Sequence, residues 1–289
     1  MANSLFLKKF LNNVGNSINA LNTTCIGISG VSSGKIEKPD SLHISWDPKD
    51  CKLVCDTSKI YIIKSAYVFL AEATIEYFDS IKYIYLLNQT EFNEFNKSSK
   101  AKKILIISEK INFDLFDYDN IEISNKIRTK DEIKLRVILA QLLIHYRNKI
   151  IHSDSKADLS LEDREYLLSQ KVFLQKNHCG LNPEDLLQHF DEGKCTLKDV
   201  SSIASNIVIL VRIIDYIFQK NITCENLDKL IKNTEIETNV QKILKSKKDL
   251  REKKLNHLLE VSFHYVNVKI RSDYVQKRLN ESEKDDKYK

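Results

Sequence analysis

Glycine and proline are scarce in this chain, and their scarcity constrains the fold more than any other feature. The sequence has 6 Gly and 3 Pro among 289 residues. β-Sandwiches, barrels and doubly wound sheets need many tight turns, and tight turns depend on these two residue types. We therefore expect an all-α protein, an antiparallel bundle of long helices joined by few loops.

Apolar residues recur every three or four positions along most of the chain, which is typical of amphipathic helices. An N-terminal helix is expected from about Leu5, followed by an irregular stretch over residues 22–58 that holds most of the turn formers. The main helices of the bundle are expected near residues 58–88, 130–152, 160–177 and 196–220. Between the first two, residues 103–108 (KILIIS) fit a strand or a helix equally well.

Three helix starts carry recognisable capping patterns: Ser160 with Asp163, Asn182 before Pro183, and Thr196 with Asp199. The sequence divides into three consecutive segments. Residues 1–57 form an N-terminal helix and an irregular segment, 58–221 a helical bundle, and 222–289 a lysine-rich helical C-terminal extension. A solvated tail is expected over residues 280–289.

The charge balance argues only weakly for a nucleic-acid partner. Lys and Arg total 45 against 40 Asp and Glu, so the net charge is +5 and the pI about 8.7. Electrostatic nucleic-acid binders usually have a pI above ~9. Only 8 of the basic residues are Arg, and the abundance of Lys, Asn and Ile resembles the coding bias of an AT-rich genome. Each arginine is therefore more informative than each lysine.

The sequence favours a cytoplasmic protein that does not enter a membrane. No stretch reaches the ~18 uninterrupted apolar residues of a membrane span, because Arg212 and Asp215 interrupt the best candidate. The N-terminus carries Lys8 and Lys9 inside an amphipathic run and lacks the pattern of a signal peptide. Six cysteines, unevenly spread, fit reduced thiols better than a disulfide framework.

One segment combines an apolar helix with a cluster of polar side chains. Residues 142–154 read LLIHYRNKIIHSD, in which Arg147 is followed by Asn148 and, five positions after the arginine, by His152. This resembles the HEPN family of small helical-bundle proteins, whose signature is an Arg, four to six residues and then a His, commonly with Asn, Asp or His directly after the Arg. The resemblance covers residues 58–220 in helix order and is residue-specific only over 142–154.

The HEPN resemblance implies a metal-independent endoribonuclease that needs no cofactor. RNA carries its own nucleophile, the 2′-hydroxyl beside each phosphate. Because imidazole ionises near neutral pH, His152 would transfer protons, and the planar guanidinium of Arg147 would stabilise charge on the phosphorane. The expected products are a 2′,3′-cyclic phosphate, or its opened form, and a 5′-hydroxyl.

Helical spacing restricts how one copy of the motif could work. Arg147 and His152 are five positions apart and point about 140° from one another on an ideal helix, whereas Asn148 and His152 share a face with His145. Since the family pairs two motifs across a dyad, the resemblance implies a homodimer with a composite active site. Asn148 would then hold the imidazole or a phosphate oxygen. The alternative for Arg147 and His152 is a helix C-terminus that favours cations.

Five further residues are candidates for supporting roles, and one of them is His145, which shares a helix face with Asn148 and His152. Asp154 would orient His152 or cap the next segment, and Glu72 would face the site or belong to a solvated stripe with Glu76. Lys149 and Lys156 would contact RNA phosphates. Some HEPN proteins are regulated by an antitoxin through a Tyr two residues after the His, and because this chain has Asp154 there, such regulation is not implied.

Other patterns are weaker. A second Arg–His spacing, Arg251 to His257, lies in a charged stretch. Residues 29–36 resemble a phosphate loop without its first glycine or its magnesium-binding hydroxyl. Cys51 and Cys55 with residues 178–179 have loose zinc-ligand spacing, so no metal site is predicted.

Two functions from different classes follow. In the first, the resemblance implies an RNA-cleaving effector of a toxin–antitoxin, abortive-infection or antiphage system, with an antitoxin, ATPase or sensor as partner. In the second, the chain is a non-catalytic HEPN-like interaction or nucleotide-binding module beside another enzyme. An all-helical scaffold unrelated to HEPN proteins is a third, weaker option.

Overall fold

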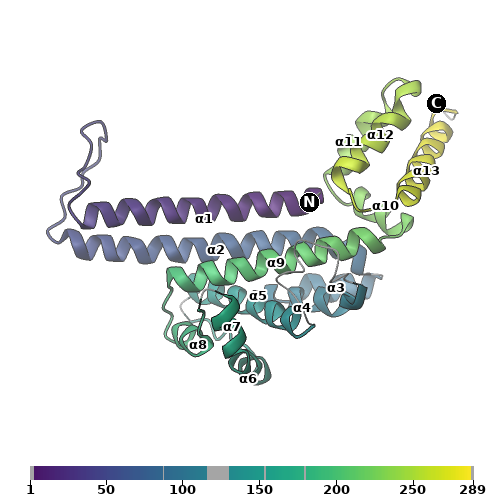
Figure 1. Ribbon diagram of the computed structural model, residues 1–289. Helices are drawn as coiled ribbons and strands as arrows, with labels where there is room; N and C mark the ends of the chain where they lie inside the picture. The colour runs from purple at the N-terminus through teal and green to yellow at the C-terminus, as the bar shows by residue number, and fades with distance from the viewer. Residues whose placement is uncertain (1–2, 87, 116–129, 153, 179, 288–289) are drawn as a thin grey trace. The chain divides into compact units, whose positions relative to one another are not determined.

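The computed structural model describes residues 3–86, 88–115, 130–152, 154–178 and 180–287. Within those ranges every regular element is a helix, which confirms the predicted all-α class (Figure 1). The α-helices are α1 (Leu5–Ser32), α2 (Cys51–Tyr85), α3 (Gln89–Lys97), α4 (Lys100–Lys110), α5 (Lys130–Ile151), α6 (Leu161–Ser169), α7 (Lys171–Asn177), α8 (Pro183–Asp191), α9 (Leu197–Asn221), α10 (Cys224–Lys232), α11 (Ile236–Leu244), α12 (Lys248–Ser262) and α13 (Val268–Lys287). A 3-10 turn covers Phe113–Leu115.

The chain forms two compact units, each assembled from separate stretches of sequence. The first unit contains Met1–Phe10, Ile75–Ile133 and Ile209–Lys289, and the second contains Leu11–Thr74 and Lys134–Val208. Helices α1, α2 and α9 contribute residues to both. The division into the three consecutive segments 1–57, 58–221 and 222–289 stays a prediction.

The N-terminal helix is longer than the sequence predicted. α1 continues to Ser32 through Gly27 and Gly30, where an irregular segment was expected to begin at residue 22. A glycine inside a helix lowers the stability of the helix by about 1 kcal/mol relative to alanine. Burial of Leu21 and Cys25 on the same helix offsets this loss. The helix ends just before Gly34, whose positive φ of 69° suits glycine.

The long helix α2 also begins earlier than predicted. It starts at Cys51 instead of near residue 58, because the carboxylate of Asp50 accepts a hydrogen bond from the backbone N–H of Leu53 at 2.9 Å. This is an N-terminal cap, which satisfies one of the free backbone donors of the first turn. The irregular segment is therefore confined to residues 33–50.

Three ambiguous or over-extended predictions are resolved by packing. Residues 103–108 are helical in α4, because Ile104 and Ile107, three positions apart, are both fully buried. The predicted helix over 160–177 is two helices, α6 and α7, which break at Gln170. The expected tail is helical as far as Lys287 in α13, and residues 280–284 are largely exposed, as a solvated tail should be.

All three predicted capping patterns are confirmed. The Ser160 hydroxyl accepts from the Asp163 N–H and donates to its carboxylate, which is a capping box. Asn182 caps α8 with Pro183 at the first helical position. The Thr196 hydroxyl accepts from the N–H of Asp199 at the start of α9.

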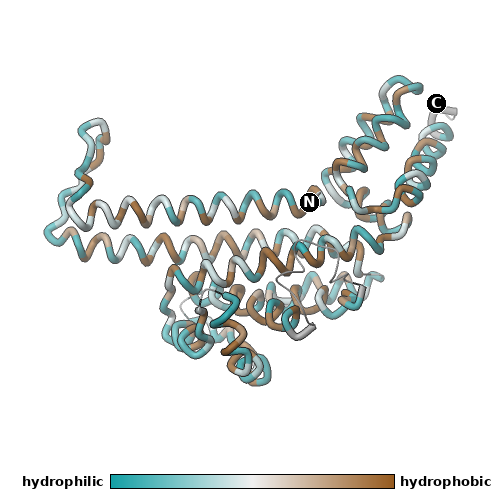
Figure 2. Tube along the Cα trace, viewed as in Figure 1, coloured by the Kyte–Doolittle hydropathy of each residue, from teal (hydrophilic) through white to brown (hydrophobic). Residues whose placement is uncertain are grey.

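Helix α9 is long and strongly apolar, and Figure 2 shows hydrophobic colour along much of it. Its length and composition would allow it to cross a membrane, but 72% of its most apolar window is buried inside the protein. Its side chains in the first unit include Ile213, Ile214 and Ile217, all buried. Packing within the core therefore accounts for its hydropathy.

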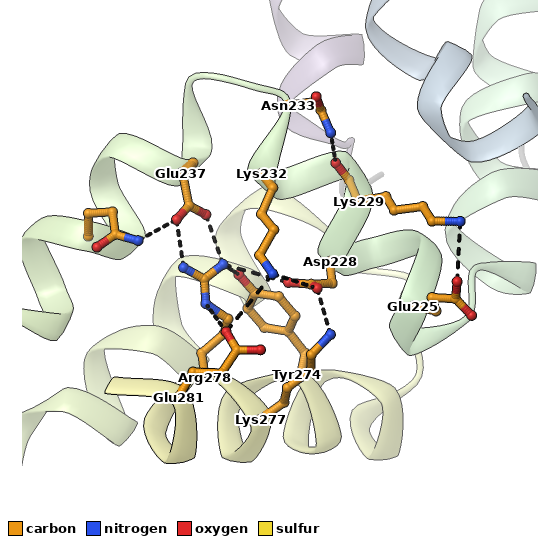
Figure 3. Close-up of polar contacts among 11 residues, drawn as sticks. Glu225, Asp228, Lys229, Lys232, Asn233, Glu237, Tyr274, Lys277, Arg278 and Glu281 are labelled. Carbon is orange, nitrogen blue, oxygen red and sulfur yellow. Dashed lines mark hydrogen bonds and ion pairs between the residues drawn. The ribbon is translucent and has the colours of Figure 1, made fainter. Parts of the chain in front are cut away.

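Ion pairs among three helices organise the C-terminal part of the first unit (Figure 3). Arg278 of α13 is only 3% exposed and makes a bidentate contact with Glu237 of α11, at 2.9 and 2.6 Å. On α10, Asp228 accepts from Lys277 at 2.6 Å and from Lys232 at 3.0 Å. Burial alone would raise the pKa of Asp228, but these two lysines outweigh burial and hold the pKa below its usual value. The contacts fix α10 and α11 against α13.

Candidate active site

The motif residues lie where buried helix α5 reaches solvent, in the second unit. The preceding residues Leu142, Leu143 and Ile144 are fully buried. Arg147 is half-buried and His152 is exposed, so burial decreases along the last turn. The N–H of His152 donates to the carbonyl of Asn148 at 2.8 Å, and the helix ends there. The predicted position at the end of an apolar helix is confirmed.

Aromatic side chains beneath the motif fix the end of α5. The Tyr146 ring lies 4.6 Å from the ring of Tyr67 on α2 and 5.0 Å from that of Phe190 on α8, measured between centroids. Its hydroxyl donates to the carbonyl of Leu186 at 3.2 Å. Because Tyr146 precedes Arg147 directly, these contacts also fix the backbone from which the arginine side chain projects.

Arg147 is held by a carboxylate from another helix. Its Nε and NH2 groups both lie 2.9 Å from one carboxylate oxygen of Glu72 on α2, and its NH1 donates to the Asn148 side chain at 3.3 Å. The arginine side chain is 18% exposed. The sequence left Glu72 between a site role and a solvated stripe with Glu76. The structure brings Glu72 to Arg147, whereas Glu76 pairs with Lys9.

His152 and Asp154 do not join this contact. Among the described residues no hydrogen bond links the His152 imidazole to Arg147, which agrees with the 140° separation expected on a helix. Within the same ranges none links it to Asp154 or to Asn148 either, although Asn148 and His152 share a helix face. Asp154 is exposed, and α6 is capped by Ser160 instead of Asp154. Ser153 lies outside the described residues. One copy of the motif therefore presents the arginine and the histidine separately.

His145 lies one turn before the motif and is partly buried. Its Nδ1 atom is buried without a hydrogen-bond partner among the described residues. Burial lowers the pKa of His145, and the charge of Lys149 lowers it further, against the opposing effect of Asp158 and Asp163. The imidazole of His145 is therefore held neutral at physiological pH.

The two lysines expected to contact RNA differ in their surroundings. Lys149 donates to the carbonyl of Phe190 at 3.3 Å, and its ammonium lies 3.7 Å from the centroid of that ring. This cation–π contact anchors α5 to α8 and leaves Lys149 poorly placed to bind phosphate. Lys156 is exposed in the loop that follows the motif.

A clamp beside the motif was not predicted. Arg164 of α6 donates to Asp158, in the loop after the motif, and makes a bidentate contact with Asp191 of α8 at 3.1 and 2.6 Å. The Arg164 guanidinium holds the pKa of Asp191 below its usual range. The rarity of arginine was a signal in the sequence that could have marked Arg164, because each of the 8 arginines carries information.

The second Arg–His pair has a different environment. Arg251 donates from Nε to the carbonyl of Ser246 at 3.0 Å and from NH1 to the Ser282 hydroxyl at 3.5 Å, so it fastens the start of α12. His257 lines a groove between α11 and α12. Arg251 lies near the start of a helix, whereas Arg147 and His152 lie at the end of one, after several buried apolar residues.

The structure does not support the phosphate-loop pattern or the zinc-ligand pattern. Residues 29–32 belong to α1, so the glycine-rich stretch is not a loop between a strand and a helix. Among the described residues no group of three His, Cys, Asp or Glu side chains could hold a metal ion. His178 contacts the Asn206 amide at 3.2 Å, and Cys179 lies outside the described residues.

Comparison with known proteins finds no family model, no curated protein and no solved structure that matches this chain.

Proposed function

We propose that this protein is a metal-independent endoribonuclease of HEPN type, with Arg147 and His152 as its catalytic pair. The observation that carries the proposal is the contact between Arg147 and Glu72, which fixes a guanidinium at the solvent edge of a buried helix. A guanidinium held in place before substrate binds costs little reorganisation when charge develops on a phosphate. The resemblance of residues 142–154 to the HEPN signature supports the same assignment.

In the proposed reaction, His152 removes the proton from the 2′-hydroxyl as its oxygen attacks phosphorus. The bond from phosphorus to the 5′-oxygen breaks, and that oxygen leaves with a proton from an imidazolium. The products are a 2′,3′-cyclic phosphate and a 5′-hydroxyl. Arg147 stabilises the charge on the phosphorane, and Asn148, already in contact with Arg147, accepts or donates a hydrogen bond at the same phosphate.

We further propose a homodimer, because one copy presents Arg147 and His152 apart. The second unit exposes an apolar stripe on α2, in which Tyr61 is 69% and Phe69 62% exposed. These residues are eight positions apart on one helical face, and Glu72 lies three positions beyond Phe69. The stripe therefore leads to the candidate site. Association of two copies along it would bury apolar surface and bring two motifs together.

Cleavage of a fluorescent RNA in the presence of EDTA tests the proposed function. We expect cleavage by the wild-type protein and loss of about 100-fold or more in rate for His152→Ala and for Arg147→Ala. The matched control is Arg251→Ala with His257→Ala, which removes the second Arg–His pair and leaves the rate unchanged. Undiminished cleavage by both motif variants overturns the proposal.

Mixing the two inactive variants tests the composite site. In a dimer formed from Arg147→Ala and His152→Ala copies, one copy supplies the histidine and the other supplies the arginine. We expect the mixture to recover cleavage that neither variant has alone. Phe69→Asp is expected to give a monomer by analytical ultracentrifugation and to lose cleavage, whereas Val172→Asp, at an exposed position on α7, leaves both unchanged.

One observation favours a second candidate function. The charge of Arg147 is already compensated by Glu72, and no contact joins it to His152 within the described part of one chain. A non-catalytic HEPN-like module that binds a nucleotide or a partner enzyme would have such an arrangement. Expression in bacteria distinguishes the two, because the enzyme is expected to arrest growth and His152→Ala to relieve the arrest.

For the ribonuclease we propose the setting that the resemblance implies, a cytoplasmic effector of a toxin–antitoxin, abortive-infection or antiphage system. Its activity would then be restrained by an antitoxin, ATPase or sensor partner. Co-purification of such a partner with the His152→Ala variant, from cells that carry the neighbouring genes, tests this setting.

A further inference from the structure

The first unit has a groove between α11 and α12 that belongs to neither motif. Its volume is about 730 Å³, within the range of ligand-binding clefts. The floor is aliphatic, formed by Ile243 of α11 and by Leu250, Leu258 and Val261 of α12. Leu250 is 40% and Val261 48% exposed, so the floor is open to solvent. Apolar surface left open beside two packed helices is a site where a further apolar surface can be buried.

The groove is surrounded by positive charge. Lys242 of α11 and Lys253, Lys254 and His257 of α12 line it, and no acidic side chain lines it. No ion pair of the three lysines is found among the described residues. Glu252 of α12 is directed to α13, where it accepts from the Gln276 side chain at 3.2 Å.

The arrangement is rigid and follows helical periodicity. Leu250, Lys254, His257 and Val261 recur at intervals of four, three and four residues, so they form one face of α12. The opposite face packs against α13 through buried Leu255 and Leu259. The ion pairs of Arg278 hold α11 against α13 (Figure 3), so both walls of the groove are in place before anything binds.

We propose that this groove binds an acidic amphipathic helix of a partner protein. Such a helix would lay its apolar stripe on the aliphatic floor, as in helix-in-groove recognition, while its carboxylates meet the lysines. Single-stranded RNA fits less well, because no Phe, Tyr or Trp side chain lines the groove for bases to stack on. A flat bilayer would leave the floor of a concave groove uncovered. The inference is independent of the proposed ribonuclease.

Fluorescence anisotropy with a designed probe tests this proposal. The probe is a labelled helical peptide of about 20 residues with Leu at every third or fourth position and Glu on its flanks. Two matched peptides carry Lys in place of Glu, or the same residues in scrambled order. We expect the acidic peptide to bind the full-length protein, and binding to weaken as salt rises. The two matched peptides are not expected to bind.

Three protein variants locate the binding. Lys254→Glu reverses one charge of the rim and Val261→Asp places a charge on the floor, and each is expected to weaken binding about tenfold or more. Lys269→Glu, at an exposed position of α13 outside the groove, is the control and leaves binding unchanged. Since all three positions are exposed, circular dichroism is expected to be unchanged.

Two outcomes overturn the proposal. One is equal binding of the acidic and scrambled peptides. The other is binding of phosphatidylserine vesicles or of single-stranded RNA that is lost in Lys254→Glu and Val261→Asp, while the acidic peptide fails to bind the wild-type protein. The first would show that the groove does not select helices, and the second would assign it to a membrane or to RNA.

Discussion

Ser4 and Asp215 are in direct contact although 211 residues separate them in the sequence. The backbone N–H of Ser4 donates to one oxygen of the Asp215 carboxylate at 3.1 Å, and the Ser4 hydroxyl donates to the other. Gln219 also donates to this carboxylate at 2.7 Å, and Tyr77 donates at 3.5 Å. The contact ties the start of α1 to the C-terminal part of α9 within the first unit, where both residues are buried.

The stability of the protein is expected to fall as pH rises from about 4 to 7, because of Asp215. Burial raises the pKa of Asp215 to about 7, against the opposing hydrogen bonds from Ser4, Gln219 and Tyr77. The folded protein therefore binds this proton more tightly than the unfolded chain. Its contribution to the free energy of unfolding is full below the unfolded pKa and decreases by at most about 1.4 kcal/mol per pH unit up to the folded pKa. Urea denaturation at several pH values measures the slope.

Asp215→Asn is the variant that identifies the source of this slope. An amide does not titrate, so the part of the slope between pH ~4 and 7 that comes from Asp215 is expected to disappear. The variant also loses stability at every pH, because an amide nitrogen cannot accept the bonds that one carboxylate oxygen accepts. An unchanged slope in Asp215→Asn would assign the pH dependence to other groups.

Removing Arg278 alone is expected to cost about 3–5 kcal/mol in the free energy of unfolding, because it leaves Glu237 without its buried cation, whereas Asp228 keeps its two lysines. Chemical denaturation of Arg278→Leu measures this loss. The double variant Arg278→Leu with Glu237→Leu removes both members of the bidentate pair, and most of the loss is expected to be recovered. If the loss in the double variant equals the sum of the losses measured for Arg278→Leu and for Glu237→Leu alone, the pair is not coupled.

Much of the fold could be predicted because its signals are local. The apolar periodicity of α5, and the caps at Ser160, Asn182 and Thr196, depend on residues within a few positions of each other. The prediction failed at Gly27 and Gly30, where propensity favoured a turn. These two glycines are helical because other residues of α1 are buried, and that burial depends on helices distant in the sequence.

The candidate site was predictable in its residue types but not in its contacts. Glu72 is conspicuous as a charge within an apolar helix, but its partner Arg147 lies 75 residues away. Only the packing of α2 against α5 distinguishes Glu72 from Glu76, four positions further on. Likewise, no sequence spacing indicates that Lys149 would contact the carbonyl and ring of Phe190 instead of being free to bind phosphate.

If the proposed function is correct, Glu72 is a positioning residue. Glu72→Gln keeps the shape of the side chain and removes its charge, so Arg147 is held less firmly. We expect a decrease of about tenfold in the rate of RNA cleavage with little change in the free energy of unfolding, since the carboxylate is half-exposed. Single-turnover cleavage measures the rate.

Glu76→Gln is the matched control for Glu72→Gln, because it lies on the same helix and pairs with Lys9 instead of Arg147. Its cleavage rate is expected to equal that of the wild type. Equal decreases in both variants would mean that Glu72 acts through general charge and not by holding Arg147.

The Arg164 clamp is expected to stabilise the loop after the motif in a pH-dependent way. Arg164→Ala removes its contacts with Asp158 and Asp191 and should cost about 1 kcal/mol, since both carboxylates are half-exposed. Because Arg164 lowers the pKa of Asp191, the ionised carboxylate adds to the free energy of unfolding at neutral pH. This contribution is lost as pH falls below about 4. Denaturation of the variant and the wild type at pH ~7 and ~3 measures both effects.

One further variant separates the geometry of the Arg164 contacts from their charge, and a second serves as a control at another ion pair. Arg164→Lys keeps the charge but cannot contact both carboxylates in the planar bidentate arrangement, so it is expected to recover only part of the loss. Lys171→Ala removes an exposed pair with Glu184 in the same unit and should change the free energy of unfolding by less than about 0.5 kcal/mol. A protonated carboxyl group no longer attracts the guanidinium, so Arg164→Ala should lose less stability at pH ~3 than at pH ~7. An equal loss in the free energy of unfolding at both pH values would contradict the role of Asp191.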